Sequence, residues 1–445
     1  MAVWSEINSG DLIKPSRIDA EYFKPHYLET RKRLEWCKPL LYYVTQVTHP
    51  AEFKRIYSDS GWSVLRAQNI RPLCIDLDSN AVFLSDRIAT TLVKNQAKFG
   101  DIFITRTGAN YGQTALYTNE CEKAVVTSHT LIVRTNDGIR SPYLALFLNT
   151  KFGRILIDQG MYGSTHPEIA PRFIKDIPVP IFDEEIVNNI SEQVIKAYDL
   201  RKHSQSLYTQ AEQLLEQELG LDKIQKDTRI TNEVSLSEAV FSHRFDAQCF
   251  KPEYIQYELA LRKMKNFVSL REVISTFSKG QQQAVSEIGK IDYVSIKDIS
   301  KGEVIASSKC YPARNLVAAD NEDLLLAITG ATIGKIGMNY RLDRVAFCGD
   351  LLSLKTRENI NPYYLLRVLE SDIAQTQFQR WITGSTNGHL SPTDVAKVVV
   401  PRLNSTIEEK IAELVQQSFI NKRESEQLLS QAKNRVEELI EQGVN

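Results

Sequence analysis

The 445-residue sequence lacks the features of a membrane span, a secreted chain and a metal-binding cysteine cluster. No apolar run approaches the roughly 18 residues that a transmembrane helix needs. The first 20 residues show no basic head followed by an apolar stretch, so we expect no signal peptide. The six cysteines are scattered and form no C-x-x-C pair. A zinc site or a disulfide framework is therefore not expected, and a reducing cytoplasmic location fits.

Recognisable catalytic motifs are also missing. The sequence contains no G-x-S-x-G elbow, no H-E-x-x-H or H-x-x-x-H pair and no G-x-x-x-x-G-K-[ST] phosphate loop. The stretch NPYY (361–364) resembles the amino-methyltransferase loop but lacks its second proline, so we expect Asn361 to cap a helix. GATIGKIG (330–337) is predicted to be a hairpin turn. His129 is predicted to be structural.

Net charge is almost absent overall, with 54 Lys and Arg against 55 Asp and Glu, but the charge is unevenly distributed. Segments 1–182 and 223–403 each carry a net charge of +4, whereas 183–222 and 404–445 carry −6 and −3. A basic excess on two segments is typical of surfaces that contact phosphate groups. Ordinary solvated surface charge would give the same small excess, so the pattern favours nucleic acid only modestly.

One phrase occurs twice: GSTHPEIAPRFIKDIPVP at 163–180 and GSTNGHLSPTDVAKVVVP at 384–401. His166, its most chemically suggestive residue, is matched by Asn387 and is not a shared catalytic group. Further pairs follow in the same order at a spacing of 220–227 residues, which predicts two homologous halves, 1–221 and 222–445. These pairs are RIDAEYFKPHY (17–27) with RFDAQCFKPEY (244–254), GDIFITRTGANYG (100–112) with EDLLLAITGATIG (322–334), and RTNDGIRSPYLALFL (134–148) with KTRENINPYYLLRVL (355–369).

Each half is predicted to begin with short strands and helices and to end in one long amphipathic helix. Apolar residues recur at a helical period between Pro180 and Gly220, and again between Pro401 and Gly443. About 36 residues per helix give rods of roughly 55 Å. The expected stripes are Ile186, Ile190, Val194, Tyr198, Leu207, Ala211 and Leu215, and Ile407, Ile411, Val415, Phe419, Leu428, Ala432 and Leu439.

The predicted fold class is α+β. Two homologous α/β globular domains, 1–182 and 223–403, are separated by two long helices, 183–222 and 404–445. We expect the helices to pack as an antiparallel coiled coil, so that the halves are related by a pseudo-twofold axis.

This order of globular segment and helix, with GST leading to IPVP or VVVP before each helix, resembles the specificity subunit of type I restriction–modification systems. The stretches DAEYFKP and DAQCFKP resemble the start of target recognition domains in that family. The resemblance covers essentially the whole chain. One mild departure is Val399, which stands where the first copy has Pro178.

The resemblance implies that each globular domain reads one half of a bipartite, asymmetric double-stranded DNA site and that the helices set the spacing. The subunit itself would be non-catalytic and would hold no cofactor. Its partners would be two modification subunits, which bind S-adenosylmethionine and methylate adenine, and restriction subunits with ATP-dependent translocase and nuclease activity. S-adenosylmethionine, ATP and Mg would therefore belong to the partner subunits.

Three alternatives stay open from the sequence. The chain could be the specificity subunit of a type IIB-like enzyme, in which methyltransferase and nuclease share one partner chain. It could be a bivalent scaffold whose globular domains bind proteins. It could also be a diverged methyltransferase that uses NPYY, which would bind S-adenosylmethionine alone.

Candidate DNA contacts are residues whose side chains suit base edges or phosphates and which differ between the copies. VLRAQNIRP (64–72) corresponds to YVSIKDISK (293–301), and TRTGANYG corresponds to AITGATIG. The hydroxyl residues of the GST phrase could instead cap the following short helix. The predicted contacts are Lys54, Arg55, Arg66, Gln68, Asn69, Arg71, Arg106, Asn110, Tyr111, Ser164, Thr165, Lys279, Gln281, Gln282, Ser295, Lys297, Lys301, Thr332, Lys335, Ser385 and Thr386.

Overall fold

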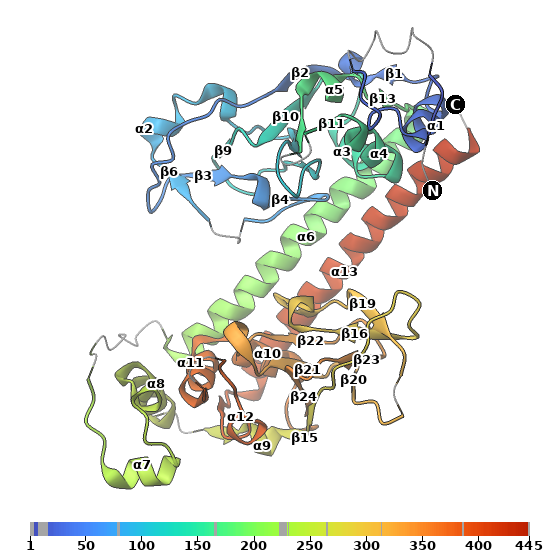
Figure 1. Ribbon diagram of the computed structural model, residues 1–445. Coiled ribbons are helices and arrows are strands. Elements are labelled where there is room, and N and C mark those ends of the chain that lie inside the picture. Colours follow the sequence, from blue (N-terminus) through green and yellow to red (C-terminus); the bar gives the residue numbers. More distant parts are fainter. Residues whose placement is uncertain are drawn as a thin grey trace. The chain divides into compact units, whose positions relative to one another are not determined.

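The structure is a computed structural model in which helices and several small sheets are mixed (Figure 1). Two compact units are present: unit 1 comprises Met1–Lys202 with Asn421–Asn445, and unit 2 comprises His203–Ile420. In the part of the chain that is described, no helix combines the length and apolarity of a membrane span. The described residues are 4–7, 17–77, 81–163, 167–221, 229, 231–263, 266–312, 314–384 and 387–443.

Unit 1 is built on two sheets. A four-stranded antiparallel sheet has the order β2-β10-β7-β8, and a three-stranded sheet has the order β6-β3-β9 with β3 and β9 parallel. The strands of these sheets are β2 (Val44–Thr48), β3 (Trp62–Leu65), β6 (Phe83–Leu84), β7 (Ile102–Thr105), β8 (Thr114–Leu116), β9 (Ala124–Val126) and β10 (Thr130–Thr135).

Three short strand pairs and several helices complete unit 1. The paired strands are β1 (Lys38–Pro39) with β13 (Pro178–Val179), β4 (Ile70–Arg71) with β5 (Cys74–Ile75), and β11 (Met161–Tyr162) with β12 (Glu168–Ile169). The helices are α1 (Pro25–Arg33), η2 (Leu40–Tyr43), η3 (Ala67–Asn69), α2 (Asp86–Ala89), η4 (Val93–Asn95), α3 (Ser141–Leu148), α4 (Lys151–Gln159) and α5 (Pro171–Lys175).

Unit 2 repeats this strand order. Its larger sheet runs β15-β24-β21-β22-β18-β17, and its second sheet runs β19-β16-β23-β20 with β16 and β23 parallel. The strands are β15 (Ile274–Lys279), β16 (Ile291–Val294), β17 (Ile299–Ser300), β18 (Gly302–Val304), β19 (Ser308–Cys310), β20 (Ala318–Asp320), β21 (Leu324–Ala327), β22 (Ile336–Met338), β23 (Arg344–Phe347) and β24 (Leu351–Thr356). The series β15-β24-β21-β22 corresponds to β2-β10-β7-β8 of unit 1, which agrees with the repeat in the sequence.

The remaining elements of unit 2 are short helices and one strand pair, β14 (Phe267–Ser269) with β25 (Val399–Pro401). The helix predicted at NPYY is α10, and Asn361 Oδ1 accepts a hydrogen bond from Tyr363 N–H at 2.9 Å, so the predicted cap is confirmed. The helices are α7 (Leu236–Ser242), η6 (Ala247–Phe250), α8 (Pro252–Lys263), α9 (Leu270–Val273), η7 (Ile296–Asp298), η8 (Gly330–Thr332), α10 (Pro362–Glu370), α11 (Asp372–Trp381) and α12 (Pro392–Val395).

The two long helices are α6 (Glu184–Leu219), with 36 residues, and α13 (Ser405–Gln442), with 38. Isolated helices are marginal in water, so most of their stability comes from burying an apolar face. The predicted stripes are largely buried, with Ile186, Leu207, Ile407 and Leu428 at their edges. The unit 1 core contains the first part of α6 and the last part of α13, and the unit 2 core contains the other parts.

Each globular part is tied to its helix entry by one buried tyrosine. In unit 1, Tyr143 on α3 donates a hydrogen bond from its hydroxyl to Pro180 O at 2.7 Å. In unit 2, Tyr364 on α10 donates to Pro401 O at 2.9 Å. Both tyrosines are fully buried. The prolines that close the repeated phrase are therefore bonded to α3 in one copy and to the equivalent helix α10 in the other.

A second contact that both units share joins the repeated R-x-D motif to the residues before GST. In unit 1, Arg17 Nη1 donates to Met161 O at 2.8 Å. In unit 2, Arg244 Nη2 donates to Ile382 O at 3.1 Å. Each arginine also pairs at 2.6 Å with the aspartate two residues after it. Two motifs that are far apart in the sequence thus meet in the same way in each unit.

The tyrosine bond gives a stability prediction. Tyr143→Phe leaves the buried carbonyl of Pro180 without its donor, which should cost about 1–3 kcal/mol of unfolding free energy. Urea unfolding followed by circular dichroism measures the change. Tyr42→Phe is the control, because Tyr42 is 63% exposed and such a change should cost less than about 0.5 kcal/mol. Equal unfolding curves for the two variants would contradict a structural role for the bond.

Candidate nucleic-acid interface

A surface cavity of about 360 Å³ in unit 1 gathers many of the predicted contact residues. Two arginines and a histidine line it together with amide and hydroxyl side chains, and its described lining contains no carboxylate. Such side chains donate hydrogen bonds to phosphate oxygens and base edges. The lining residues are Arg55, Tyr57, Arg66, Ala67, Gln68, Thr107, Gly108, Ala109, Asn110, Thr127 and His129.

Four segments bring these residues together. They are the loop after β2, the corner between β3 and η3, the turn between β7 and β8, and the residues between β9 and β10. The β7–β8 turn needs a left-handed backbone at Gly108, where φ is +89°. No atom would contact an added Cβ within 4 Å there, so the backbone conformation and not space requires the glycine. The open turn presents its backbone and Asn110 to solvent.

Arg55 is held at one side of the cavity. Its Nη2 lies 3.3 Å from Glu52 Oε1 and 3.2 Å from His129 Nε2. Nδ1 of the same histidine lies 2.8 Å from Thr107 Oγ1. His129, which lines the cavity, and Glu52, which does not, therefore fix the orientation of an exposed guanidinium group.

Arg106, which ends the β7 side of the turn, is held in a similar way. Its guanidinium pairs with Glu168 on β12, and its Nη1 lies 2.9 Å from His49 Nε2. Tyr162 donates a hydrogen bond from its hydroxyl to the same carboxylate at 2.8 Å. The side chain is half-buried, and the network leaves its orientation with little freedom.

The electrostatics keep these groups in their paired states at neutral pH. The hydrogen bond from Ser128 lowers the pKa of the Glu52 carboxyl below its usual 4.5. The hydrogen bond from Tyr162, followed by the charge of Arg106, does the same for the pKa of Glu168. Burial, followed by the charge of Arg106, lowers the pKa of His49 below 6.5. Both carboxylates are therefore charged and His49 is neutral at pH 7.

The other residues predicted in unit 1 occupy different environments. Lys54 is exposed next to the cavity, and Arg71 is half-buried on β4. Tyr111 is half-buried beneath the Arg154 guanidinium, whose central carbon lies 5.1 Å from the ring centroid. Ser164 and Thr165 lie outside the described residues.

Asn69 is a correction to the sequence analysis. It is 3% exposed, and its side chain accepts a hydrogen bond from Arg66 N–H at 3.0 Å and donates one to Asp76 O at 2.8 Å. The Asn69 amide therefore forms hydrogen bonds to the backbone within the turn after β3. We do not include it in the candidate interface. Asp298 takes the equivalent place in unit 2, where it accepts from Ser295 N–H at 2.8 Å.

In unit 2 the predicted residues are spread over several segments. Ser295 is half-buried and donates from its hydroxyl to Asp298 at 2.8 Å, and Lys335 Nζ donates to Ile296 O at 3.2 Å. These two side chains already have internal partners. Ser385 and Thr386 lie outside the described residues. The exposed or half-exposed remainder is Lys279, Gln281, Gln282, Lys297, Lys301 and Thr332.

The predicted hairpin turn at GATIGKIG is confirmed, because β21 and β22 pair antiparallel on either side of it. Gly330 and Gly334 have φ of +78° and +95°, as such a turn requires. In the matching turn of unit 1, Gly108 and Gly112 have φ of +89° and +71°. Both units therefore present the same turn with different side chains.

Sequence reasoning missed His129, Thr107 and Tyr57 as members of this site. His129 was expected to be structural, but it is exposed and precedes β10 rather than lying in it. One signal was available: the pair Thr107 and His129 corresponds to Thr329 and Asp350 in the second copy, and both pairs are hydrogen-bonded. The second member of this polar pair differs between the copies, a histidine in one and an aspartate in the other.

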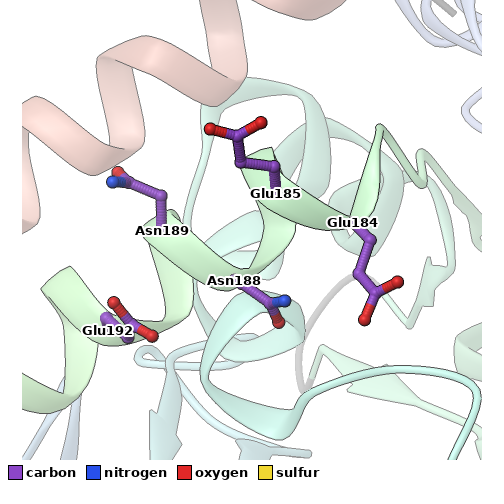
Figure 2. A pocket seen from close by; sticks show the side chains of 5 residues that line it. All are labelled: Glu184, Glu185, Asn188, Asn189 and Glu192. Carbon is purple, nitrogen blue, oxygen red and sulfur yellow. The ribbon is translucent and has the colours of Figure 1, made fainter.

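A second cavity of unit 1 is acidic and has a different character. Five side chains of α6 line about 460 Å³ of it, and Figure 2 shows that they point in different directions along the helix and do not converge. No group of ligands that could hold a metal occurs among the residues the structure describes. This surface is therefore not built as an ion site. Its residues are Glu184, Glu185, Asn188, Asn189 and Glu192.

The buried turn amide gives a second prediction. Asn69→Ala removes two internal hydrogen bonds and leaves Arg66 N–H and Asp76 O to find other partners, at a cost of about 1–3 kcal/mol. Thermal unfolding measures the loss. Gln68→Ala is the neighbouring control, because Gln68 is half-exposed and lines the cavity. If Asn69→Ala is no less stable than Gln68→Ala, the assignment of Asn69 to the turn is wrong.

No protein-family model and no curated protein sequence matches this chain. Among solved structures, an S subunit of a type I restriction–modification system from M. genitalium is 12% identical, covers 92% of this chain and 95% of its own, and has a TM-score of 0.45. The HsdS subunit from Thermoanaerobacter tengcongensis is 13% identical, with coverage of 92% and 95% and a TM-score of 0.28. The type IIG restriction endonuclease BpuSI covers 42% of this chain and 30% of its own, at 10% identity and a TM-score of 0.29.

The chain is similar, over most of its length, to solved S subunits of type I restriction–modification systems.

Proposed function

We propose that this chain is the DNA-binding specificity subunit of a type I restriction–modification complex. The observation that carries the proposal is one scaffold presented twice with different side chains. Unit 1 contains the strand order β2-β10-β7-β8, and unit 2 contains the equivalent order β15-β24-β21-β22. Both units also contain the same glycine turn. At that turn, Arg106 and Asn110 of unit 1 are replaced by Ile328 and Thr332 in unit 2. A protein that reads two different half-sites needs this combination.

The unit 1 cavity suits DNA because its side chains donate in fixed directions. Arg66 and Gln68 line the cavity from the segment after β3, and Asn110 lines it from the β7–β8 turn. Arginine donates to the acceptor edge of guanine, and glutamine or asparagine pairs with adenine. The carboxylates Glu52 and Glu168 support the arginines and do not line the cavity. We infer that unit 1 reads one half of a bipartite site.

Unit 2 would read the other half with a different set of side chains. Its exposed candidates are lysines, glutamines and a threonine, and no arginine is among them. Lys279 ends β15, Gln281 and Gln282 follow it, and Lys297 and Lys301 lie on either side of β17. Lysine contacts phosphate as a point charge and lacks the planar fork of arginine. An asymmetric site follows from this difference between the halves.

We further propose that α6 and α13 pair as antiparallel helices that set the gap between the half-sites. Support comes from contacts inside each unit. In unit 1, Ser425 Oγ donates to Ala197 O at 2.6 Å, and in unit 2, Ser418 Oγ lies 3.0 Å from Ser204 Oγ. Ala197 of α6 contacts Ser425 of α13, and the later residue Ser204 of α6 contacts the earlier residue Ser418 of α13. This opposite order is that of an antiparallel helix pair.

In this proposal segments 1–182 and 223–403 are target recognition domains, and 183–222 and 404–445 are helical spacers. The chain performs no catalysis of its own. Two adenine-methylating modification subunits dock on the helices, and restriction subunits join for cleavage. S-adenosylmethionine, ATP and Mg act in those partner subunits.

The DNA-reading role predicts sequence-dependent, salt-sensitive binding. The full chain, purified together with the proposed modification subunits, is equilibrated with a pool of duplexes of random sequence, and bound DNA is recovered on filters. We expect a bipartite consensus and an affinity that falls as salt rises. If the pool shows no sequence enrichment, the DNA-reading role is wrong, and a protein-binding scaffold becomes the better explanation.

Variants of the cavity separate base reading from charge. Arg66→Ala or Gln68→Ala should relax one half of the consensus, with a loss of about 1–3 kcal/mol of discrimination, and should leave the other half unchanged. Lys54→Ala, at an exposed neighbouring position, should weaken binding to all sequences about equally. If Arg66→Ala behaves like Lys54→Ala, Arg66 contacts phosphate and not a base.

The spacer role predicts a change of gap without a change of half-sites. Removing residues 199–205 and 417–423 together preserves the pairing of α6 with α13 and shortens each helix by about 10 Å. We expect the unread gap to shorten by about three base pairs at roughly 3.4 Å each. Selection from the same DNA pool measures the gap. A changed half-sequence at a constant gap would show that the helices do not set the spacing.

A further inference from the structure

The contacts around His129 define which of its ring nitrogens accepts a hydrogen bond and which one donates. Its Nε2 lies 3.2 Å from Arg55 Nη2, and its Nδ1 lies 2.8 Å from Thr107 Oγ1. A guanidinium group has only donors, so Nε2 must accept with its lone pair. The proton of the neutral ring is then on Nδ1, where the threonine hydroxyl accepts it. Arg55 is thus held between a neutral imidazole and the Glu52 carboxylate.

The contacts around His49 offer two alternative bonds to one nitrogen. Its Nε2 lies 2.9 Å from Arg106 Nη1 and 3.1 Å from Ser128 O. The arginine only donates and the carbonyl only accepts. The neutral tautomer with its proton on Nδ1 accepts from Arg106 at Nε2, whereas a ring protonated on Nε2 donates to Ser128 O and gives up the arginine. Glu168 holds the other side of Arg106 in both states.

We propose that His49 and His129 are positioning residues, each of which accepts a hydrogen bond from one arginine and so fixes that guanidinium for base reading by unit 1. This inference rests on the DNA-reading role proposed above and deepens it. A planar guanidinium reads a base only when its fork is aligned with the base edge. A freely rotating arginine still attracts phosphate, so loss of the histidines affects discrimination more than affinity.

Protonation of His49 removes its bond to Arg106, because an imidazolium ring has no acceptor nitrogen and repels the guanidinium. The charged groups that face His49 are Arg106, Glu168 and Glu52. Those that face His129 are Arg55 and Glu52. Burial and Arg106 lower the pKa of His49 below 6.5, so its bond is intact at neutral pH and is lost only as the pH falls below that value.

Unit 2 provides an internal control for this inference. The equivalent of the Thr107–His129 pair is Thr329–Asp350, with a hydrogen bond of 2.5 Å. Ile328 stands where unit 1 has Arg106. Its reading of DNA therefore does not pass through a neutral histidine at this position. Lower pH should relax the half-site of unit 1 and leave that of unit 2 in place.

The test compares phenylalanine and glutamine at each histidine in the full chain with its modification subunits. His129→Phe and His49→Phe keep a flat ring but remove the acceptor, whereas His129→Gln and His49→Gln place an amide oxygen near Nε2 and cannot titrate. The random duplex pool is selected at about pH 8 and at about pH 5, on either side of the usual histidine pKa. His26→Gln is the control, because that ring packs on Tyr27 of α1.

We expect each Phe variant to lose discrimination at the unit 1 half-site by at least about fivefold at the higher pH, at the lower end of what one base contact contributes. Both Gln variants should keep discrimination, and His49→Gln should also lose its dependence on pH. Wild type and His26→Gln should relax at the unit 1 half-site on acidification. An intact unit 2 half-site in every sample shows that the variants are folded and assembled.

Two results would overturn the inference while leaving the DNA-reading role standing. One is full discrimination by both Phe variants at the higher pH. The other is a pH profile of His49→Gln that equals that of wild type. Absence of any sequence enrichment for wild type would instead contradict the proposed function itself.

Discussion

Burial of the apolar stripes on α6 and α13 is the constraint on which the rest of the structure depends. Each helix contributes one part of its stripe to the unit 1 core and the other part to the unit 2 core. Long helices gain little from propensity alone, and packing supplies most of their stability. Val194 lies in one core and Leu215 in the other, although both are on α6. Neither unit is therefore complete without a part of each long helix.

The joints between globular part and helix follow from this constraint. Tyr143 and Tyr364 bond to the carbonyl groups of the prolines that precede the helices, and Arg17 and Arg244 bond to the backbone before the GST phrase. The two copies share these tyrosines and arginines because each copy attaches its globular part to its long helix in the same way. The residues of the β7–β8 turn and its unit 2 equivalent face solvent and differ between copies. A fixed attachment with a variable surface is the arrangement expected of a protein that reads two sequences.

The candidate site was only partly visible in the sequence. Arg55, Arg66, Gln68 and Asn110 were selected for their chemical type, and they line one cavity. Asn69 was selected on the same ground but is buried, because a short amide between β3 and β4 also satisfies the backbone of a tight turn. Residue type alone does not distinguish a reader of bases from a residue that caps a turn. Burial and hydrogen-bond partners make that distinction.

The sequence by itself determined the repeat, the long helices and the glycine turns, because these depend on periodicity and backbone conformation, which are local properties. It also determined that Asn361 caps a helix. Only the tertiary structure decided which side chains meet. Arg55 lies in the loop after β2 and His129 lies between β9 and β10, so their hydrogen bond depends on how these segments are brought together. Which nitrogen of His129 accepts a hydrogen bond and which one donates follows from those partners. No local sequence pattern indicates it.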